Sequence, residues 1–422
     1  MKRTERLWPQ LVVAVVVIAA FARIMAAALI KEQRPTTQYD TYLIVLSGVA
    51  LLIVLVGQTW RTRVVAVAAV LVLFWLSGPI SAVMHSQPVP MTPIALALAA
   101  GVVTVGLGQQ GRWLLTTITM VFLAIMIGIS LWYGWQQKHG IARGAFYTKG
   151  ADEHTWFGLY QLQGISFHPN TLGGWCVTAI VAASVLLWHR LSKRGGWRLV
   201  SIVGAVALTV VLIASLVALV WSQSRTSIWA LAVAVVFALI VILTRKVAPK
   251  ARRFIMITLV AAAAGLSIIT VIVGTVHPAI SFHGRTTAWS AALATFRENP
   301  LTGYGPDAFA GPGYWARFGT QPWYPVHAHN QVLETAAESG LLGLVPLIAA
   351  TVLCGLLAAR VSYQQALMPM AMMGFLAAQG SMEVILGLSY WPLSSLVPLC
   401  AVVLMVGDYR WRSSGAGKPI VA

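Results

Sequence analysis

The sequence is poor in charge. Only 9% of its 422 residues are Asp, Glu, Lys or Arg, whereas 58% are hydrophobic, and the mean hydropathy is +0.79. A soluble domain of this length cannot hide so much apolar surface with so few charged groups. The apolar excess must therefore face a bilayer, and the fold class predicted is an all-α integral membrane protein, with 1–422 as a single polytopic membrane domain.

Twelve apolar segments have about the 20 residues that a membrane-spanning helix needs. They are 8–30, 41–59, 64–84, 92–108, 113–135, 169–188, 199–221, 226–244, 254–275, 341–359, 365–384 and 389–407. Two connections are much longer than turns: a first loop at 136–168 and a large loop at 276–340. Loops of that length usually carry function.

Acidic residues are also scarce, with 11 Asp and Glu against 29 Lys and Arg and a formal net charge of +18. The connections of one side, which include both termini, hold 19 of the cations and two acids, whereas those of the other side hold nine of each. This is the positive-inside pattern. The basic excess therefore indicates topology and not nucleic-acid binding, and it places the long loops on the outer face.

The three cysteines, Cys176, Cys354 and Cys400, all fall in apolar helices, which argues against a disulfide framework and redox chemistry. Clustered carboxylates are missing too, because only Asp152 and Glu153 are adjacent among the outer acids. Sites for divalent metal ions normally use such clusters. No metal and no cofactor is therefore predicted.

The large loop contains an expected helix at 286–299, because apolar residues follow Trp289 at helical spacing and Asn299-Pro300 ends the pattern. Arg285 precedes this helix, where a cation opposes the helix dipole. It either shares an anionic ligand with the free amides or pairs with a loop carboxylate. The aromatic rings of the loop, Trp289 among them, either anchor in the membrane interface or stack on sugars.

A second short helix is expected at 332–339, with Asn330 as its N-cap and Gly340 as its stop. His329 would lie at the positive end of this helix, where the dipole keeps an imidazole neutral and able to accept a proton. His327 is an alternative base two residues away. A lone histidine is, however, more often a hydrogen-bonded structural group.

Arg225 lies in the polar break 221–227 between two apolar helices, where an unpaired cation costs about 2.5–3.5 kcal/mol. It either meets an anion or extends toward the headgroups. On the same side, His168 and Asn170 begin another membrane helix. Asn170 either caps that helix or contacts a ligand.

His329-Asn330, followed after nine residues by Gly340 and after two more by Gly343, resembles the His-[Asn/Ser/Gln]-x9-Gly-x2-[Gly/Thr/Tyr] motif of the O-antigen ligase family. Three further elements are similar to parts of that family. They are Ser222-Gln223-Ser224-Arg225, Gly284-Arg285-Thr286-Thr287-Ala288-Trp289 and His168-Pro169-Asn170-Thr171-Leu172-Gly173. The likeness is firmest over about 150–350.

The resemblance implies a membrane fold like that of the GT-C glycosyltransferases, with about twelve spanning helices and short helices in the large periplasmic loop. It implies transfer of O-antigen polysaccharide from undecaprenyl pyrophosphate to lipid A-core, at the periplasmic face of the bacterial inner membrane. His329 matches the family's essential histidine, and Arg225 and Arg285 match arginines implicated in binding the donor pyrophosphate.

We also expect substrate contacts from Asn330, His168, Asn170, His327 and Trp289. One base and one leaving-group clamp predict a metal-independent, inverting transfer. O-antigen polymerases and protein O-oligosaccharyltransferases use the same donors and stay as alternatives. A lipid or polysaccharide transporter is the alternative of another class.

Overall fold

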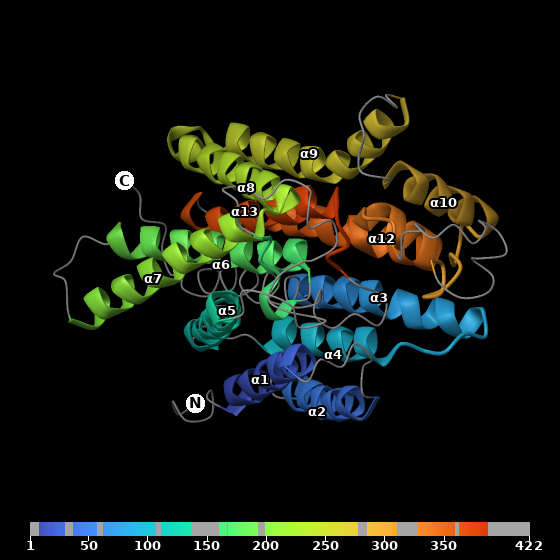
Figure 1. Ribbon diagram of the computed structural model, residues 1–422, viewed down its shortest axis with the longest axis horizontal. Coiled ribbons are helices and arrows are strands. Elements are labelled where there is room, and N and C mark those ends of the chain that lie inside the picture. Colours follow the sequence, from blue (N-terminus) through green and yellow to red (C-terminus); the bar gives the residue numbers. More distant parts are fainter. Residues whose placement is uncertain are drawn as a thin grey trace.

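The computed structural model describes residues 8–29, 37–56, 62–106, 111–136, 160–166, 168–192, 199–276, 285–309, 327–358 and 363–386. These ranges are mainly α-helical and contain no β-strand (Figure 1). In chain order the helices are α1 (Trp8–Leu29), α2 (Thr37–Val56), α3 (Thr62–Met84), α4 (Met91–Gly106), α5 (Gly111–Gln136), α6 (Pro169–Leu191), α7 (Leu199–Ser222), α8 (Arg225–Leu243), α9 (Pro249–Val276), α10 (Arg285–Glu298), α12 (Gln331–Ala358) and α13 (Tyr363–Gly380).

Six of these helices, α5 to α9 and α12, are long and apolar enough to cross a membrane. Shorter apolar helices accompany them, so the predicted class of an α-helical membrane protein is supported. Each expected span from 8–30 to 365–384 coincides with a helix. The last one, 389–407, lies outside the described residues, and so do Cys400 and most of the first long loop.

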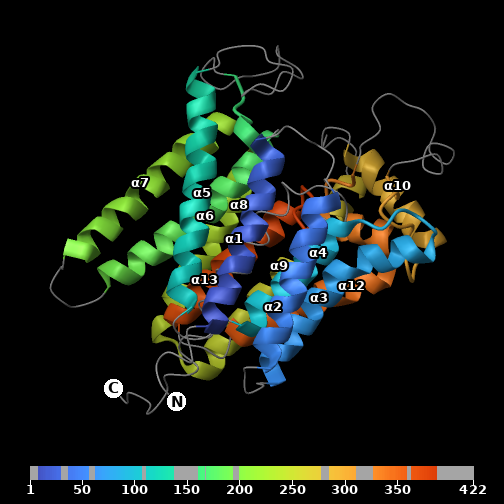
Figure 2. The ribbon, with the colours of Figure 1, turned by 90° about the horizontal axis from the view of Figure 1, so that it is seen from below.

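Two groups of helices lie on either side of α12 (Figures 1 and 2), and contacts of α5 with α1 and α6 also connect them. In the first group α2 and α3 pack on α4, and in the second α13 packs on α8 and α6 lies against both α7 and α8. Helix α12 contacts α3 on one side and α9 and α13 on the other. The beginning of α12 therefore lies where both groups meet.

A buried ion pair joins the N-terminal helices. Arg23 of α1 donates from Nε to Oδ1 of Asp40 at 3.0 Å, and Thr92 donates to Oδ2 at 3.0 Å. The expected span 41–59 leaves Asp40 in a connection, and this is wrong, because α2 begins at Thr37 and holds Asp40 in its first turn. Arg23, which falls inside the expected span 8–30, is thus neutralised between helices.

Helix α12 is interrupted at Gly340, whose φ of 56° and ψ of −146° are not helical. The expected stop is therefore confirmed, but the second helical part follows at once. The amides of Leu341 and Leu342 donate to the carbonyls of Pro300 and Leu301 at 2.8 and 3.0 Å, so the interruption leaves them paired. A Cβ at Gly340 would lie 2.6 Å from the Pro300 oxygen, which requires glycine here.

A small core attaches α10 to the first part of α12. Trp289 is fully buried there and packs with Ala292, Phe309, Leu333 and Ala337. This packing fixes the beginning of α10 next to the beginning of α12. The expected helix after Arg285 and its end at Asn299-Pro300 agree with the structure within one residue.

Candidate functional site

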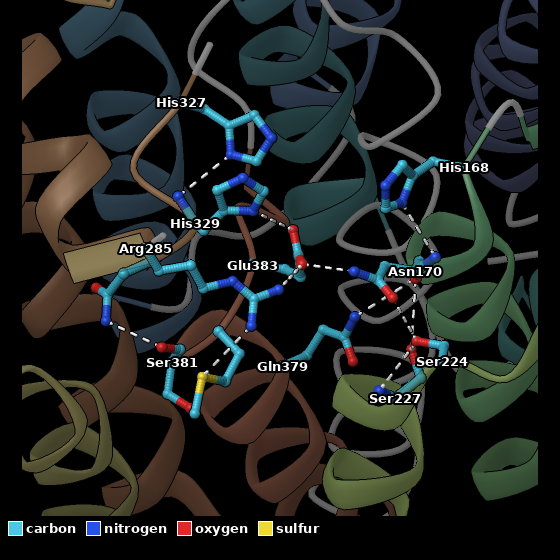
Figure 3. A network of polar contacts seen from close by, with 12 residues as sticks. His168, Asn170, Ser224, Ser227, Arg285, His327, His329, Gln379, Ser381 and Glu383 are labelled. Carbon is cyan, nitrogen blue, oxygen red and sulfur yellow. Dashed lines mark hydrogen bonds and ion pairs between the residues drawn. The ribbon is translucent and has the colours of Figure 1, made fainter. Parts of the chain in front are cut away.

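The site is built around the carboxylate of Glu383, which follows the end of α13 in a turn (Figure 3). Its Oε1 accepts hydrogen bonds from Arg285 Nη2 and from Asn170 Nδ2, both at 2.6 Å. Its Oε2 lies 3.1 Å from His329 Nδ1. One buried carboxylate therefore joins three residues that the sequence places far apart.

Helices α6, α10 and α12 begin at this carboxylate, and α8 begins beside α6, at Ser224. They contribute Asn170, Ser224, Arg285 and His329 to one polar network, in which Ser224 Oγ donates to Asn170 Oδ1 at 2.8 Å (Figure 3). A helix N-terminus carries partial positive charge and unpaired N–H groups. Four such ends and a guanidinium make this region suited to an anion.

Two helix caps hold the network in place. Ser224 is the N-cap of α8, and His168 is the N-cap of α6, with its Nδ1 accepting from the Asn170 amide at 3.1 Å. Gly173 lets α6 approach α8 closely, because a Cβ at Gly173 would lie 2.7 Å from the Ser227 Cβ. The proposal that Asn170 caps α6 is thus wrong. Its side chain is freed for Glu383 and Ser224.

The capping role predicted for Asn330 is confirmed. Its Oδ1 accepts from the amides of Val332 and Leu333 at 3.0 and 3.1 Å, at the beginning of α12. Its Nδ2 donates to the Ser381 carbonyl at 3.1 Å, close to Glu383. Asn330 is fully buried, so it supports the turn that carries His329.

His329 lies in a tight turn before that cap, with a φ of 50° that side-chain-bearing residues rarely adopt. Its amide donates to His327 Nδ1 at 3.2 Å, and the Ala328 amide donates to Glu334 Oε2 at 2.5 Å. The two imidazoles lie in contact, with ring centroids 3.9 Å apart. The His329 side chain is 26% exposed, so the ring can be reached from outside.

The ionisation states follow from burial and charge. Burial alone would raise the pKa of Glu383, but the hydrogen bond from His329 and the charge of Arg285 bring that pKa below its ordinary value. Burial lowers the pKa of His327 to about 3, with a further contribution from His329. Burial also lowers the pKa of His168, against the charge of Glu383. At neutral pH the network thus holds an ionised Glu383 and neutral His327 and His168.

The two arginines have different surroundings. Arg285 forms an ion pair with Glu383. Of the two expected partners, an anionic ligand or a loop carboxylate, the structure thus shows a carboxylate, but one that lies outside the large loop. Arg225 is exposed at the first position of α8, directly after Ser224. Its guanidinium makes no hydrogen bond or ion pair with the described part of the chain. Arg225 is thus close to the network along the chain but outside it.

A metal ion has to be considered, because one ligand atom from each of His327, His329 and Glu383 lies within 4.8 Å of the others. Two histidines and a carboxylate can ligate zinc. Here, however, both Glu383 oxygens already accept hydrogen bonds, and the Arg285 guanidinium lies 2.6 Å from one of them. This donor set fits proton transfer beside an anion better than it fits a cation.

Sequence reasoning missed Glu383. It counted this residue among the acids of the outer connections, although the residue falls within the expected span at 365–384. The signal was present, because Glu383 is the only charged residue of that segment. An ionisable residue in a membrane segment is by default a candidate functional residue. The structure ends α13 at Gly380, which leaves Glu383 in a turn at the end of the bundle.

Residues 210–348 match the model of a family described as O-antigen ligase. This segment includes Arg225, Arg285 and His329, but neither His168 and Asn170 nor Glu383. No curated protein matches the chain.

Proposed function

On the premise that the chain is of an O-antigen ligase type, which the match over 210–348 supports, we propose that it transfers O-antigen glycan from undecaprenyl pyrophosphate to a sugar hydroxyl of lipid A-core. The family supports ligase- or polymerase-type activity in lipopolysaccharide biosynthesis. The single observation that carries the finer proposal is that Glu383 joins Asn170, Arg285 and His329, at the beginnings of α6, α10 and α12.

The donor pyrophosphate binds where these helices begin. Departure of the lipid pyrophosphate concentrates negative charge on its oxygens, and guanidinium groups stabilise it by charge-assisted hydrogen bonds. Arg285 supplies one guanidinium, and Arg225 is available because no described residue engages it. Both arginines then act on the leaving group, with support from the helix dipoles.

His329 is the general base. With Nδ1–H donated to Glu383 Oε2, the other nitrogen, Nε2, has its lone pair free for the acceptor. The acceptor hydroxyl gives its proton to Nε2 as its oxygen bonds to the anomeric carbon, and the bond from that carbon to the phosphate oxygen breaks. Glu383 stabilises the resulting imidazolium without taking the proton.

One base and one leaving-group site correspond to a single displacement, which inverts the anomeric carbon. Because guanidinium groups and helix ends carry the charge of the leaving group, the transfer needs no metal. The positive-inside pattern supports an active site at the periplasmic face of the inner membrane, with both termini in the cytoplasm.

Reconstitution of the purified protein with lipid-linked glycan and lipid A-core tests the proposal. His329→Ala should slow transfer at least about a hundredfold, since a positioned base contributes about 10²–10⁴-fold. Arg285→Lys should recover little of the activity lost in Arg285→Ala, because lysine lacks the planar fork. Wild-type protein should stay active in excess EDTA.

Wild-type rates in His329→Ala would remove the base from the mechanism. Activity lost in EDTA and restored by a divalent ion would replace the arginine mechanism with a metal-assisted one. A matched control is Thr295→Val in α10, because Thr295 is buried and bonds only within its helix, to Ala291 at 2.9 Å.

The same assay separates the alternatives by acceptor. A polymerase would extend a second lipid-linked glycan, and a protein O-oligosaccharyltransferase would glycosylate a hydroxyl of a protein. A transporter would move the lipid between leaflets and form no glycosidic bond.

A further inference from the structure

Glu383 belongs to a short turn that two side chains of α12 hold from both sides. On one side, Asn330 Nδ2 donates to the Ser381 carbonyl at 3.1 Å. On the other side, Gln331 Oε1 accepts from the amides of Ile385 and Leu386 at 2.9 and 2.7 Å. The contacts lie two residues before Glu383 and two and three residues after it.

Gln331 is a buried residue with several contacts to this turn. Its side chain is almost fully buried, at 4% exposure, and its Nε2 donates to the Leu386 carbonyl at 3.2 Å and to Thr335 Oγ1 at 3.1 Å. Every polar atom of the amide is therefore used. A buried amide satisfied this fully specifies one position for the segment it holds.

The order of residues along the chain fixes the distance between the base and the carboxylate. His329, Asn330 and Gln331 are consecutive, so the backbone that carries the base also carries both side chains that hold the carboxylate. The 3.1 Å separation of His329 Nδ1 from Glu383 Oε2 is thereby set by neighbours of His329. Small displacements of a catalytic group cost much rate, because the hydrogen bond that orients it is lost.

We propose that Gln331 is a positioning residue that fixes the tautomer and orientation of His329 by holding Glu383 against it. This inference rests on the proposed role of His329 as base. Gln331 has no part in binding the donor, because its amide is fully occupied within the protein.

The test is a double-mutant cycle in the reconstituted transfer assay, with Gln331→Met, Glu383→Gln and the double variant. Methionine keeps the length of the side chain and removes all four hydrogen bonds. Gln331→Met should lower kcat about tenfold or more and leave KM for the donor within about twofold, as part of the 10²–10⁴-fold that a positioned base supplies. In the Glu383→Gln background the same change should cost less than about twofold, because the partner it acts through has already lost its charge.

Thr295→Val is the matched control, since it removes a buried hydrogen bond within α10 and touches neither Gln331 nor residues 385 and 386. It should keep near-wild-type kcat. If Gln331→Met does not fold, Asn330→Asp carries the cycle, because aspartate keeps the cap of α12 and loses the donor to Ser381. It too should lower kcat less in the Glu383→Gln background.

Equal losses of kcat in both backgrounds, or a loss in Thr295→Val as large as in Gln331→Met, would overturn the positioning role even if His329→Ala still shows the loss expected of a missing base. Wild-type activity in His329→Ala would instead overturn the proposed function. The pH profile adds an independent readout, because Gln331→Met should shift the limb of kcat that reports the base, whereas a general loss of stability would not.

Discussion

Removal of Glu383 should leave Arg285 as an uncompensated, largely buried cation. Their side chains are 10% and 17% exposed, and the ion pair measures 2.6 Å. Breaking a buried pair by removing one partner costs about 3–5 kcal/mol. Because Arg285 retains some contact with solvent, we expect Glu383→Gln to lose less than that range, about 2–3 kcal/mol.

Removal of the second charge should restore part of this loss. In Glu383→Gln with Arg285→Met, no cation is left to desolvate, so the double variant should be less destabilised than the sum of the two single variants by at least about 1.5 kcal/mol. The two side chains share one hydrogen bond, so their effects cannot be independent if the pair exists as described.

Thermal unfolding of the purified proteins in detergent measures this coupling. Each variant is compared with the wild type and with Thr295→Val as a control for a buried polar loss within one helix. Strictly additive shifts of the unfolding midpoint, or a Glu383→Gln protein as stable as the wild type, would refute the description of Glu383 as the centre of the network.

Two further predictions concern pH and topology. The pKa of His327 is lowered to about 3 in the folded protein, so between about pH 6.5 and 3 this residue binds fewer protons in the folded than in the unfolded protein. The free energy of unfolding should therefore fall as the pH decreases through this range, by at most about 1.4 kcal/mol per pH unit for this group. As the pH is lowered from 7.5 to 5, the unfolding midpoint should fall less in His327→Gln than in the wild type. Equal slopes in the two proteins would contradict a neutral His327 ring in the folded protein. In intact spheroplasts of a strain with a cysteine-free protein, an impermeant thiol reagent should label a cysteine at position 320 but not one at position 192. The reverse result would invert the topology and remove a periplasmic site.

Parts of the site were predictable because they depend on local chemistry. Asn330 as a cap and Gly340 as a stop follow from side-chain reach and backbone sterics within a few residues. The spacing from His329 to Gly340 and Gly343 indicated the family that the match over 210–348 supports. The prediction that Asn170 caps α6 was wrong, because the sequence does not distinguish an asparagine that caps a helix from one that bridges two side chains. The N-cap of α6 is instead His168, one residue before Pro169.

By itself the sequence determined the membrane class and the positions of nearly all described helices, since each depends on hydropathy within one segment. The sidedness of the connections is a prediction from their charge, which the thiol labelling tests. Only the tertiary structure decided that Glu383 closes the site, that Trp289 lies in a core and that Gln331 holds the turn after α13. These facts depend on contacts between residues far apart in the sequence, such as the 54 positions between His329 and Glu383. No periodicity within a segment encodes them, because they arise only when the ends of several helices are packed together.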